Sequence, residues 1–185
     1  IIIKGYVMKT AFQQKNTAHH FQPFSDNKEL SETGIKLISK AEGVYIYEDN
    51  GKKYLDGMAG LWCVNIGYGR KELVEAASQQ MTELPYYNLF FKTTTAPATE
   101  LAAKIASLAP AHMNKVFFTG SGSDANDTNF RMVRRYWDLK GKPTKKTFIS
   151  RKNAYHGSTV AAASLGGMGY MHEQGDLPID GIVHV

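Results

Sequence analysis

Small and polar residues gather in one short stretch that could bind a phosphate group. Ser121-Gly122-Ser123 follows the apolar pair Phe117-Phe118, and a sequence with helical periodicity comes after it. The first N–H groups of a helix have no partner within it, and the helix dipole adds positive potential there. Glycine lets a backbone approach a ligand closely, and serine hydroxyls add donors. The stretch therefore predicts an anion site, with ordinary helix capping as the alternative.

A second group of residues could contact a flat ring. Tyr155, His156 and Gly157 occur together in a loop that precedes the helix expected at 159–165. A tyrosine face stacks on an aromatic ligand with about 0.5–1.5 kcal/mol beyond the burial of area, and an imidazole can hydrogen-bond a polar edge. Taken singly, Tyr155 is better explained as a core residue and His156 as a hydrogen-bonded loop residue. Next to a phosphate site, the ligand-binding interpretation is favoured.

The elements expected around these loops would bring them together. Residues 117–118 are expected to form a buried strand, 127–140 a helix and 146–150 a second strand. The helix would bury a face made of Thr128, Met132, Tyr136 and Leu139. Strand, helix and strand make a βαβ unit with parallel strands. Ligands of open α/β sheets bind at the carboxyl ends of strands, where both loops would lie. Neither the P-loop pattern nor the dinucleotide-binding pattern is present.

A phosphate site beside an aromatic face suits pyridoxal 5'-phosphate, and here the sequence resembles a known family. Residues 121–126 and 153–159 resemble the phosphate and ring-stacking motifs of class III pyridoxal-phosphate-dependent aminotransferases. The subgroup that it resembles most is that of the ω-transaminases, of the ω-amino acid or amine:pyruvate type. Four further segments resemble this subgroup in the family's order, and they are residues 20–24, 54–65, 87–92 and 146–172. The resemblance covers about residues 18–185.

The resemblance implies roles for individual residues. The cofactor-binding residues would be Ser121, Gly122, Ser123, Tyr155, His156 and Gly157. The substrate pocket would be lined by Phe24, Trp62, Phe90 and Tyr170. Two positions depart from the subgroup's pattern: Gly120 stands where the subgroup often has asparagine, and Asp124 where glutamate is more usual. The family also implies a homodimer with active sites shared between subunits.

The implied fold is α/β, of the pyridoxal-phosphate-dependent transferase fold type I. We expect residues 1–90 to form an N-terminal segment that contributes to the small domain and the substrate pocket. Residues 91–185 would form the first part of the large cofactor domain. The family's Schiff-base lysine and its aspartate beside the pyridine nitrogen match nothing in residues 146–185. We therefore expect both beyond Val185, a chain truncated inside the large domain, and no catalysis by this segment alone.

Composition narrows the class of protein. With 43% hydrophobic and 21% charged residues, the chain is typical of folded soluble proteins. The net charge of +5 is spread along the chain, and the basic residues within 131–146 indicate a solvated helix face and loop and not a nucleic-acid site. Cys63 is the only cysteine, so a reducing compartment, the cytoplasm, is expected. The sequence contains no run of about 18 apolar residues, so no membrane span is predicted. The histidines are not spaced like metal ligands, so no metal site is predicted either.

The remaining segments predict a mixture of strands and helices. Residues 44–47 and 53–56 favour a hairpin across Gly51, and residues 31–40 a connector. Helices are expected at 71–84 and 97–108, with inward faces made of Leu73, Val74, Ala77 and Met81 in the first and Leu101, Ile105 and Leu108 in the second. Residues 9–17 should be loosely ordered, and 181–185 should form a strand. Met8 is expected to be the natural start, preceded by added residues.

These patterns predict an enzyme that moves an amino group from a primary amine or ω-amino acid to a keto acid such as pyruvate. Two alternatives remain open at this stage. One is a non-catalytic α/β module that binds a nucleotide or a sugar phosphate. The other is a different pyridoxal-phosphate reaction on the same fold, such as racemisation or decarboxylation of an amino acid.

Overall fold

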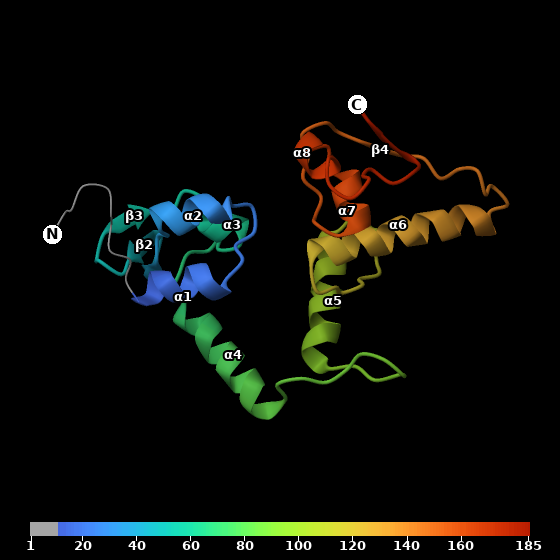
Figure 1. The fold of residues 1–185 in the computed structure, drawn as a ribbon. Coiled ribbons are helices and arrows are strands. Elements are labelled where there is room, and N and C mark those ends of the chain that lie inside the picture. The colour runs from blue at the N-terminus through green and yellow to red at the C-terminus, as the bar shows by residue number, and fades with distance from the viewer. Residues whose placement is uncertain (1–10) are drawn as a thin grey trace. The chain divides into compact units, whose positions relative to one another are not determined.

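The structure, a computed structural model, describes residues 11–185 and divides into two compact units, residues 1–88 and 89–185. The two units are described separately below, and Figure 1 shows the elements of each. The expectation that Met8 is the natural start falls outside the described residues. Among the helices of residues 11–185, none combines the length and the apolar character that crossing a bilayer requires.

The first unit contains a three-stranded antiparallel sheet in the order β1-β2-β3. Its strands are Ile38–Glu42, Tyr45–Glu48 and Lys53–Leu55, and β2 and β3 form the predicted hairpin, in which Tyr45 pairs with Leu55. Gly51 has φ 85°, a value that glycine adopts without strain, which explains why the turn falls there. The strand β1 was not predicted, because the connector expected at 31–40 contains the end of α2 (Asn27–Thr33) and the start of β1.

Three further helical elements complete this unit. They are α1 (Ala11–His19), α3 (Ala59–Trp62) and α4 (Lys71–Glu83). The expectation of a loosely ordered 9–17 segment is wrong for residues 11–17, which are helical. The helix α4 agrees with its prediction, but the expected inward face does not: Leu73, Val74 and Met81 are exposed. Within the described residues, no second element covers that face.

The second unit is built around the long helix α6. Its elements are α5 (Ala96–Leu108), α6 (Gly122–Leu139), β4 (Phe148–Ser150), α7 (Val160–Leu165), α8 (Gly169–His172) and β5 (Ile182–His184). The predicted strands at 146–150 and 181–185 are confirmed as β4 and β5, which pair in parallel, with Phe148 opposite Ile182. The predicted helix 159–165 is confirmed as α7. In Figure 1, α7 lies against the N-terminal half of α6.

The strand predicted at Phe117-Phe118 is wrong. These residues have no regular secondary structure, and Phe117 is 74% exposed. A strand needs a partner for its backbone groups, and among the described residues β4 pairs only with β5. The parallel pair of this unit is therefore β4 with β5, and α7 and α8 lie between them in sequence.

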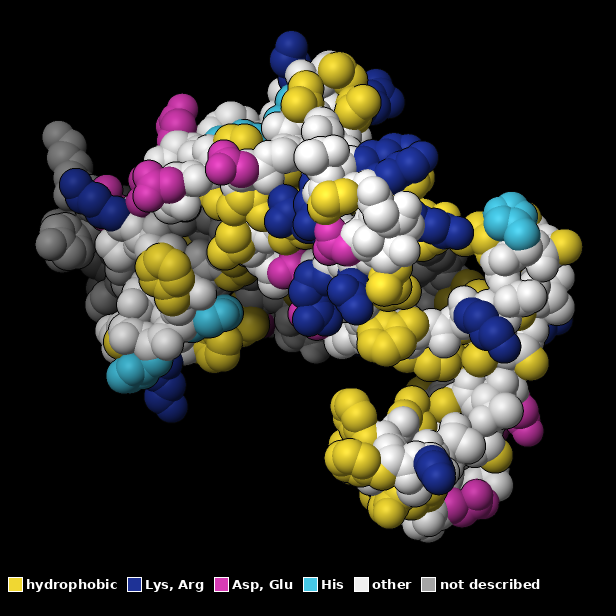
Figure 2. Space-filling model, turned by 90° about the vertical axis from the view of Figure 1, so that its right-hand side faces the viewer, with side chains coloured by type: hydrophobic (Ala, Val, Ile, Leu, Met, Phe, Trp, Pro, Cys, Tyr) yellow, Lys and Arg dark blue, Asp and Glu magenta, His cyan; other side chains and the backbone are white. Residues whose placement is uncertain are grey.

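The core of the second unit is small and lies between α6, β4 and α7. Phe130 is 5% exposed and stacks on Phe148 at a centroid distance of 4.3 Å, while Ala162 and Ala163 of α7 are buried. The predicted inward face of α6 is wrong, since Met132, Tyr136 and Leu139 are exposed. The same holds for α5, whose predicted face is made of Leu101, Ile105 and Leu108. Hydrophobic side chains at the surface are visible in Figure 2.

Candidate functional site

The six residues predicted to bind the cofactor line one cavity. This cavity has a volume of about 440 Å³, and the residues around it are Ser121, Gly122, Ser123, Asn126, Tyr155, His156 and Gly157. They come from two segments, the first turn of α6 and the loop that joins β4 to α7. The two loops that the sequence singled out are therefore neighbours in space, even though the strand expected before the first one is absent.

The start of α6 offers hydrogen-bond donors to this cavity. Ser121 is the N-cap residue, and its Oγ accepts from the backbone N–H of Asp124 at 3.1 Å. The backbone carbonyl of Ser121 accepts from Ala125. Among the described residues, the N–H groups of Gly122 and Ser123 have no acceptor. Such open N–H groups at a helix start can bind an anion.

Gly122 leaves room for a ligand at these donors. A Cβ atom built on Gly122 would meet no atom within 4 Å, so the space above its backbone is open. Ser123 Oγ accepts from the N–H of Ser158 at 3.1 Å, and its own hydrogen therefore remains able to donate. This arrangement of two N–H groups and a hydroxyl fits the phosphate group of pyridoxal 5'-phosphate.

The loop that joins β4 to α7 forms the second wall of the cavity, and it approaches α6 closely at Gly157. Gly157 is buried with φ 130°, and a Cβ atom there would lie 2.5 Å from Ser123 Oγ and 2.7 Å from Ala162 Cβ. Only glycine permits this approach. The loop on its N-terminal side carries Tyr155, which is 48% exposed, and His156. Tyr155 and the open N–H groups of Gly122 and Ser123 thus border the same cavity.

Two residues that the sequence analysis missed connect the walls of the cavity. Asn126 Nδ2 donates to the carbonyl of His156 at 2.6 Å. Asp127 Oδ1 accepts from Thr159 Oγ1 at 2.7 Å and from the N–H of Ala162 at 3.1 Å, so α6 supplies a side-chain cap to α7. Helical spacing could have revealed them, because positions three and four residues after Ser123 lie on the same helix face.

The two departures from the family pattern lie next to each other. A Cβ atom on Gly120 would be 3.2 Å from Oδ2 of Asp124. The Asp124 carboxylate thus lies next to the Gly120 backbone, and it would have to shift slightly if residue 120 carried a side chain. Asp124 lines a neighbouring cavity and not the one with the cofactor candidates.

The lining of that cavity, which belongs to the second unit, includes none of the four predicted substrate-pocket residues. Phe24 and Trp62 belong to the first unit, and Phe90 and Tyr170 to the second. All four side chains are more than half exposed, from 52% for Tyr170 to 76% for Trp62. Their convergence on one substrate pocket stays a prediction.

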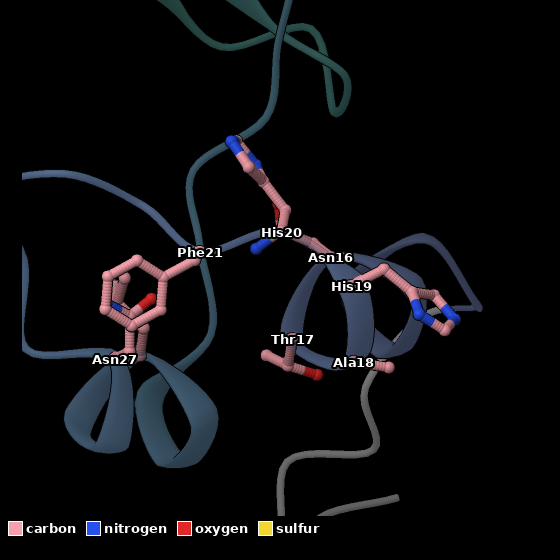
Figure 3. A pocket seen from close by; sticks show the side chains of 8 residues that line it. Asn16, Thr17, Ala18, His19, His20, Phe21 and Asn27 are labelled. Atoms are coloured by element: carbon pink, nitrogen blue, oxygen red, sulfur yellow. The ribbon is translucent and has the colours of Figure 1, made fainter.

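The segment before Phe24 borders a different, smaller cavity. This cavity has a volume of about 190 Å³, lies at the end of α1 and the start of α2, and is lined by residues that include His19, His20 and Phe21 (Figure 3). The amide of Asn27 bonds both backbone groups of Gln22, each at 3.1 Å. These bonds fix the turn that leads to Phe24. Within residues 11–185, no three His, Cys, Asp or Glu residues are placed to hold a metal ion.

Comparisons with known proteins identify the family of the chain. The family described as aminotransferase class-III matches residues 28–183. A putrescine–pyruvate aminotransferase of Pseudomonas aeruginosa is 63% identical over 174 residues, which are 94% of this chain and 38% of that protein. The omega transaminase of Pseudomonas jessenii, solved in complex with PMP, matches with a TM-score of 0.92 and 44% identity. That match covers 95% of this chain and 39% of the solved chain.

A further solved structure that matches the chain is an engineered enzyme. It is a thermostable omega transaminase variant with substitutions at a tryptophan, a phenylalanine and an arginine, engineered for asymmetric synthesis of enantiopure bulky amines. It matches with a TM-score of 0.92 and 42% identity over 95% of this chain and 39% of its own. The chain thus spans about two fifths of the length of these relatives.

Proposed function

This chain belongs to the class III aminotransferase family, and on that premise we propose that the protein moves an amino group from a primary amine or ω-amino acid to a keto acid such as pyruvate. The family and the complex with PMP indicate pyridoxal 5'-phosphate as the cofactor. When bound, it supplies a carbonyl that takes up the amino group and a ring that accepts electrons. Side chains and backbone groups of the protein would bind the cofactor and orient it.

The observation that carries this proposal is that both predicted loops, residues 121–123 and 155–157, line one cavity. The N–H groups of Gly122 and Ser123 would bind the phosphate, and Ser123 Oγ would donate a third hydrogen bond. Tyr155 would lie against the ring, and the neighbouring His156 would hydrogen-bond a polar edge. Asn126 and Asp127 would keep the two walls at a fixed separation.

For the substrates, we propose a small diamine such as putrescine as donor and pyruvate as acceptor. The support is the 63% identity with a putrescine–pyruvate aminotransferase. Trp62 and Phe90 would line the donor pocket: they lie 28 positions apart, the same spacing as the tryptophan and phenylalanine substituted in the variant for bulky amines. Phe24 and Tyr170 would complete the wall. A homodimer with shared active sites and a cytoplasmic location are part of the same proposal.

The test measures alanine formed from pyruvate and putrescine by the full-length protein. We expect turnover that depends on added pyridoxal 5'-phosphate, and a drop of about tenfold in cofactor affinity in Ser123→Ala, since a hydrogen bond to a charged group is worth about 1.5–3 kcal/mol. Ser107→Ala is the matched control, because Ser107 Oγ only bonds a carbonyl within α5. Tight binding of a nucleotide without any turnover would favour the non-catalytic module instead.

A further inference from the structure

The one-turn element α3 (Ala59–Trp62) has an unusual backbone. All four residues have positive φ, from 47° at Ala59 to 65° at Trp62, and three of the four carry a Cβ atom. A residue with a Cβ atom loses about 1–2 kcal/mol in the left-handed region. Such a turn persists only where surrounding contacts hold it, and strained residues of this kind cluster at ligand-binding sites. The contacts around α3 therefore show what holds it.

The carboxylate of Asp56, just after β3, is the first of these contacts. Its Oδ2 accepts from the N–H of Gly60 at 2.8 Å and from the hydroxyl of Tyr68 at 2.6 Å, and its Oδ1 accepts from the N–H of Met58 at 3.2 Å. The Tyr68 hydroxyl, with help from these backbone N–H groups, holds the pKa of Asp56 below its ordinary value. Asp56 is thus charged at neutral pH and bonded to the turn and to Tyr68.

Tyr68 is the second contact, and it is fixed at both ends. Its backbone exchanges two hydrogen bonds with Gly43, at 2.7 and 3.1 Å, which ties it to the connection between β1 and β2. Its hydroxyl lies against the turn, since a Cβ atom on Gly60 would be 2.9 Å from the Tyr68 oxygen. The sheet, Tyr68, Asp56 and α3 therefore form one connected network.

Trp62 stands at the end of this network with 76% of its surface exposed. A return of Leu61 or Trp62 to the right-handed region would change the direction of the indole. We propose that Asp56 and Tyr68 are positioning residues that set the direction of the Trp62 side chain and thereby the size of amine donor that the enzyme accepts. This inference rests on the proposed function, in which Trp62 lines the donor pocket.

The experiment compares Tyr68→Phe and Asp56→Asn with Tyr54→Phe in the full-length protein. Tyr54 is the matched control, because its hydroxyl also bonds a carboxylate, that of Glu48 at 2.8 Å, and Glu48 belongs to β2 and not to the turn before α3. The protein is labelled with 5-fluorotryptophan, and the signal of Trp62 is assigned by its loss in Trp62→Phe. For each variant, the 19F shift and the ratio of kcat/KM for 1-phenylethylamine to that for putrescine are measured.

We expect Tyr68→Phe and Asp56→Asn to shift or broaden the Trp62 signal and to change the donor ratio about tenfold, chiefly through KM of the bulky donor. Tyr54→Phe should leave both unchanged. If Tyr68→Phe does not fold, the 19F shift and the donor ratio of Asp56→Asn test the inference. An unchanged Trp62 signal in the folded variants overturns the inference, and so does a moved signal with an unchanged donor ratio. Failure of the unmodified protein to use either amine refutes the proposed function, and the 19F shift still tests the positioning of Trp62 separately.

Discussion

Two regions of the molecule differ in how their side chains are contacted. One is the pair of helices α6 and α7, and the other is the helix α4. Ser123, Asn126 and Asp127 of α6 each hydrogen-bond the segment 156–162. Leu73, Val74 and Met81 of α4 form an apolar face that is exposed. The polar site is thus specified by contacts inside residues 121–166, whereas nothing among the described residues covers the apolar face of α4.

The largest effect expected from this difference is on stability. Phe130→Ala should lower the free energy of unfolding by about 3–5 kcal/mol, because it empties the stack on Phe148 in the buried core. Val74→Ala should cost less than about 0.5 kcal/mol, because Val74 is 65% exposed. Chemical unfolding of the full-length variants measures both. Equal losses would show that the α4 face is covered in the complete protein and would remove the contrast.

The close approach of the loop to α6 gives the next largest effect. Gly157→Ala places a Cβ atom 2.5 Å from Ser123 Oγ, so the loop must move, at a cost of about 1–3 kcal/mol. We expect affinity for pyridoxal 5'-phosphate to fall about tenfold or more in equilibrium dialysis. Gly169→Ala is the control, because a Cβ atom there meets nothing within 4 Å. Unchanged affinity in Gly157→Ala would show that the cofactor does not use this loop.

The cap that α6 supplies to α7 should have a smaller effect. Asp127→Ala leaves the N–H of Ala162 without its acceptor and should cost about 1 kcal/mol. Hydrogen exchange at Ala162 should become faster, and cofactor affinity should weaken with it. Asn129→Ala, at an exposed position of the same helix, should change neither. Protection at Ala162 that survives in Asp127→Ala would mean that α7 does not depend on α6.

The smallest effect concerns acid stability of the first unit. The Tyr68 hydroxyl lowers the pKa of Asp56 from its ordinary value of 3.8. A carboxyl whose pKa is lower in the folded state stabilises fully above its ordinary pKa, and this contribution is lost as the pH falls through the folded value. Asp56→Asn should therefore flatten the decline of stability below about pH 4, measured by thermal unfolding across pH. A decline of unchanged steepness would argue against the Asp56–Tyr68 bond.

The sequence predicted those features whose signals are local. The hairpin across Gly51 and the helices expected at 97–108 and 159–165 are present in the structure, the helices as α5 and α7. The strand at Phe117-Phe118 and the inward helix faces were wrong, because they depend on partners that an apolar pattern cannot identify. The six predicted cofactor residues do line one cavity.

Other parts of the site could not be predicted from sequence patterns. The left-handed turn at Ala59–Trp62 runs against the preference of alanine, leucine and tryptophan, so only its contacts with Asp56 and Tyr68 reveal it. Asn126 and Asp127 appear in a sequence as ordinary polar residues of a helix start. Their role becomes visible only when α7 is placed beside α6.

The most direct test of the account is a crystal structure of the full-length protein with pyridoxal 5'-phosphate bound. We predict phosphate oxygens within about 2.7–3.2 Å of the N–H nitrogens of Gly122 and Ser123, and the pyridine ring lying against Tyr155. A cofactor phosphate held by other residues, or a ring that does not touch Tyr155, would contradict the central claim.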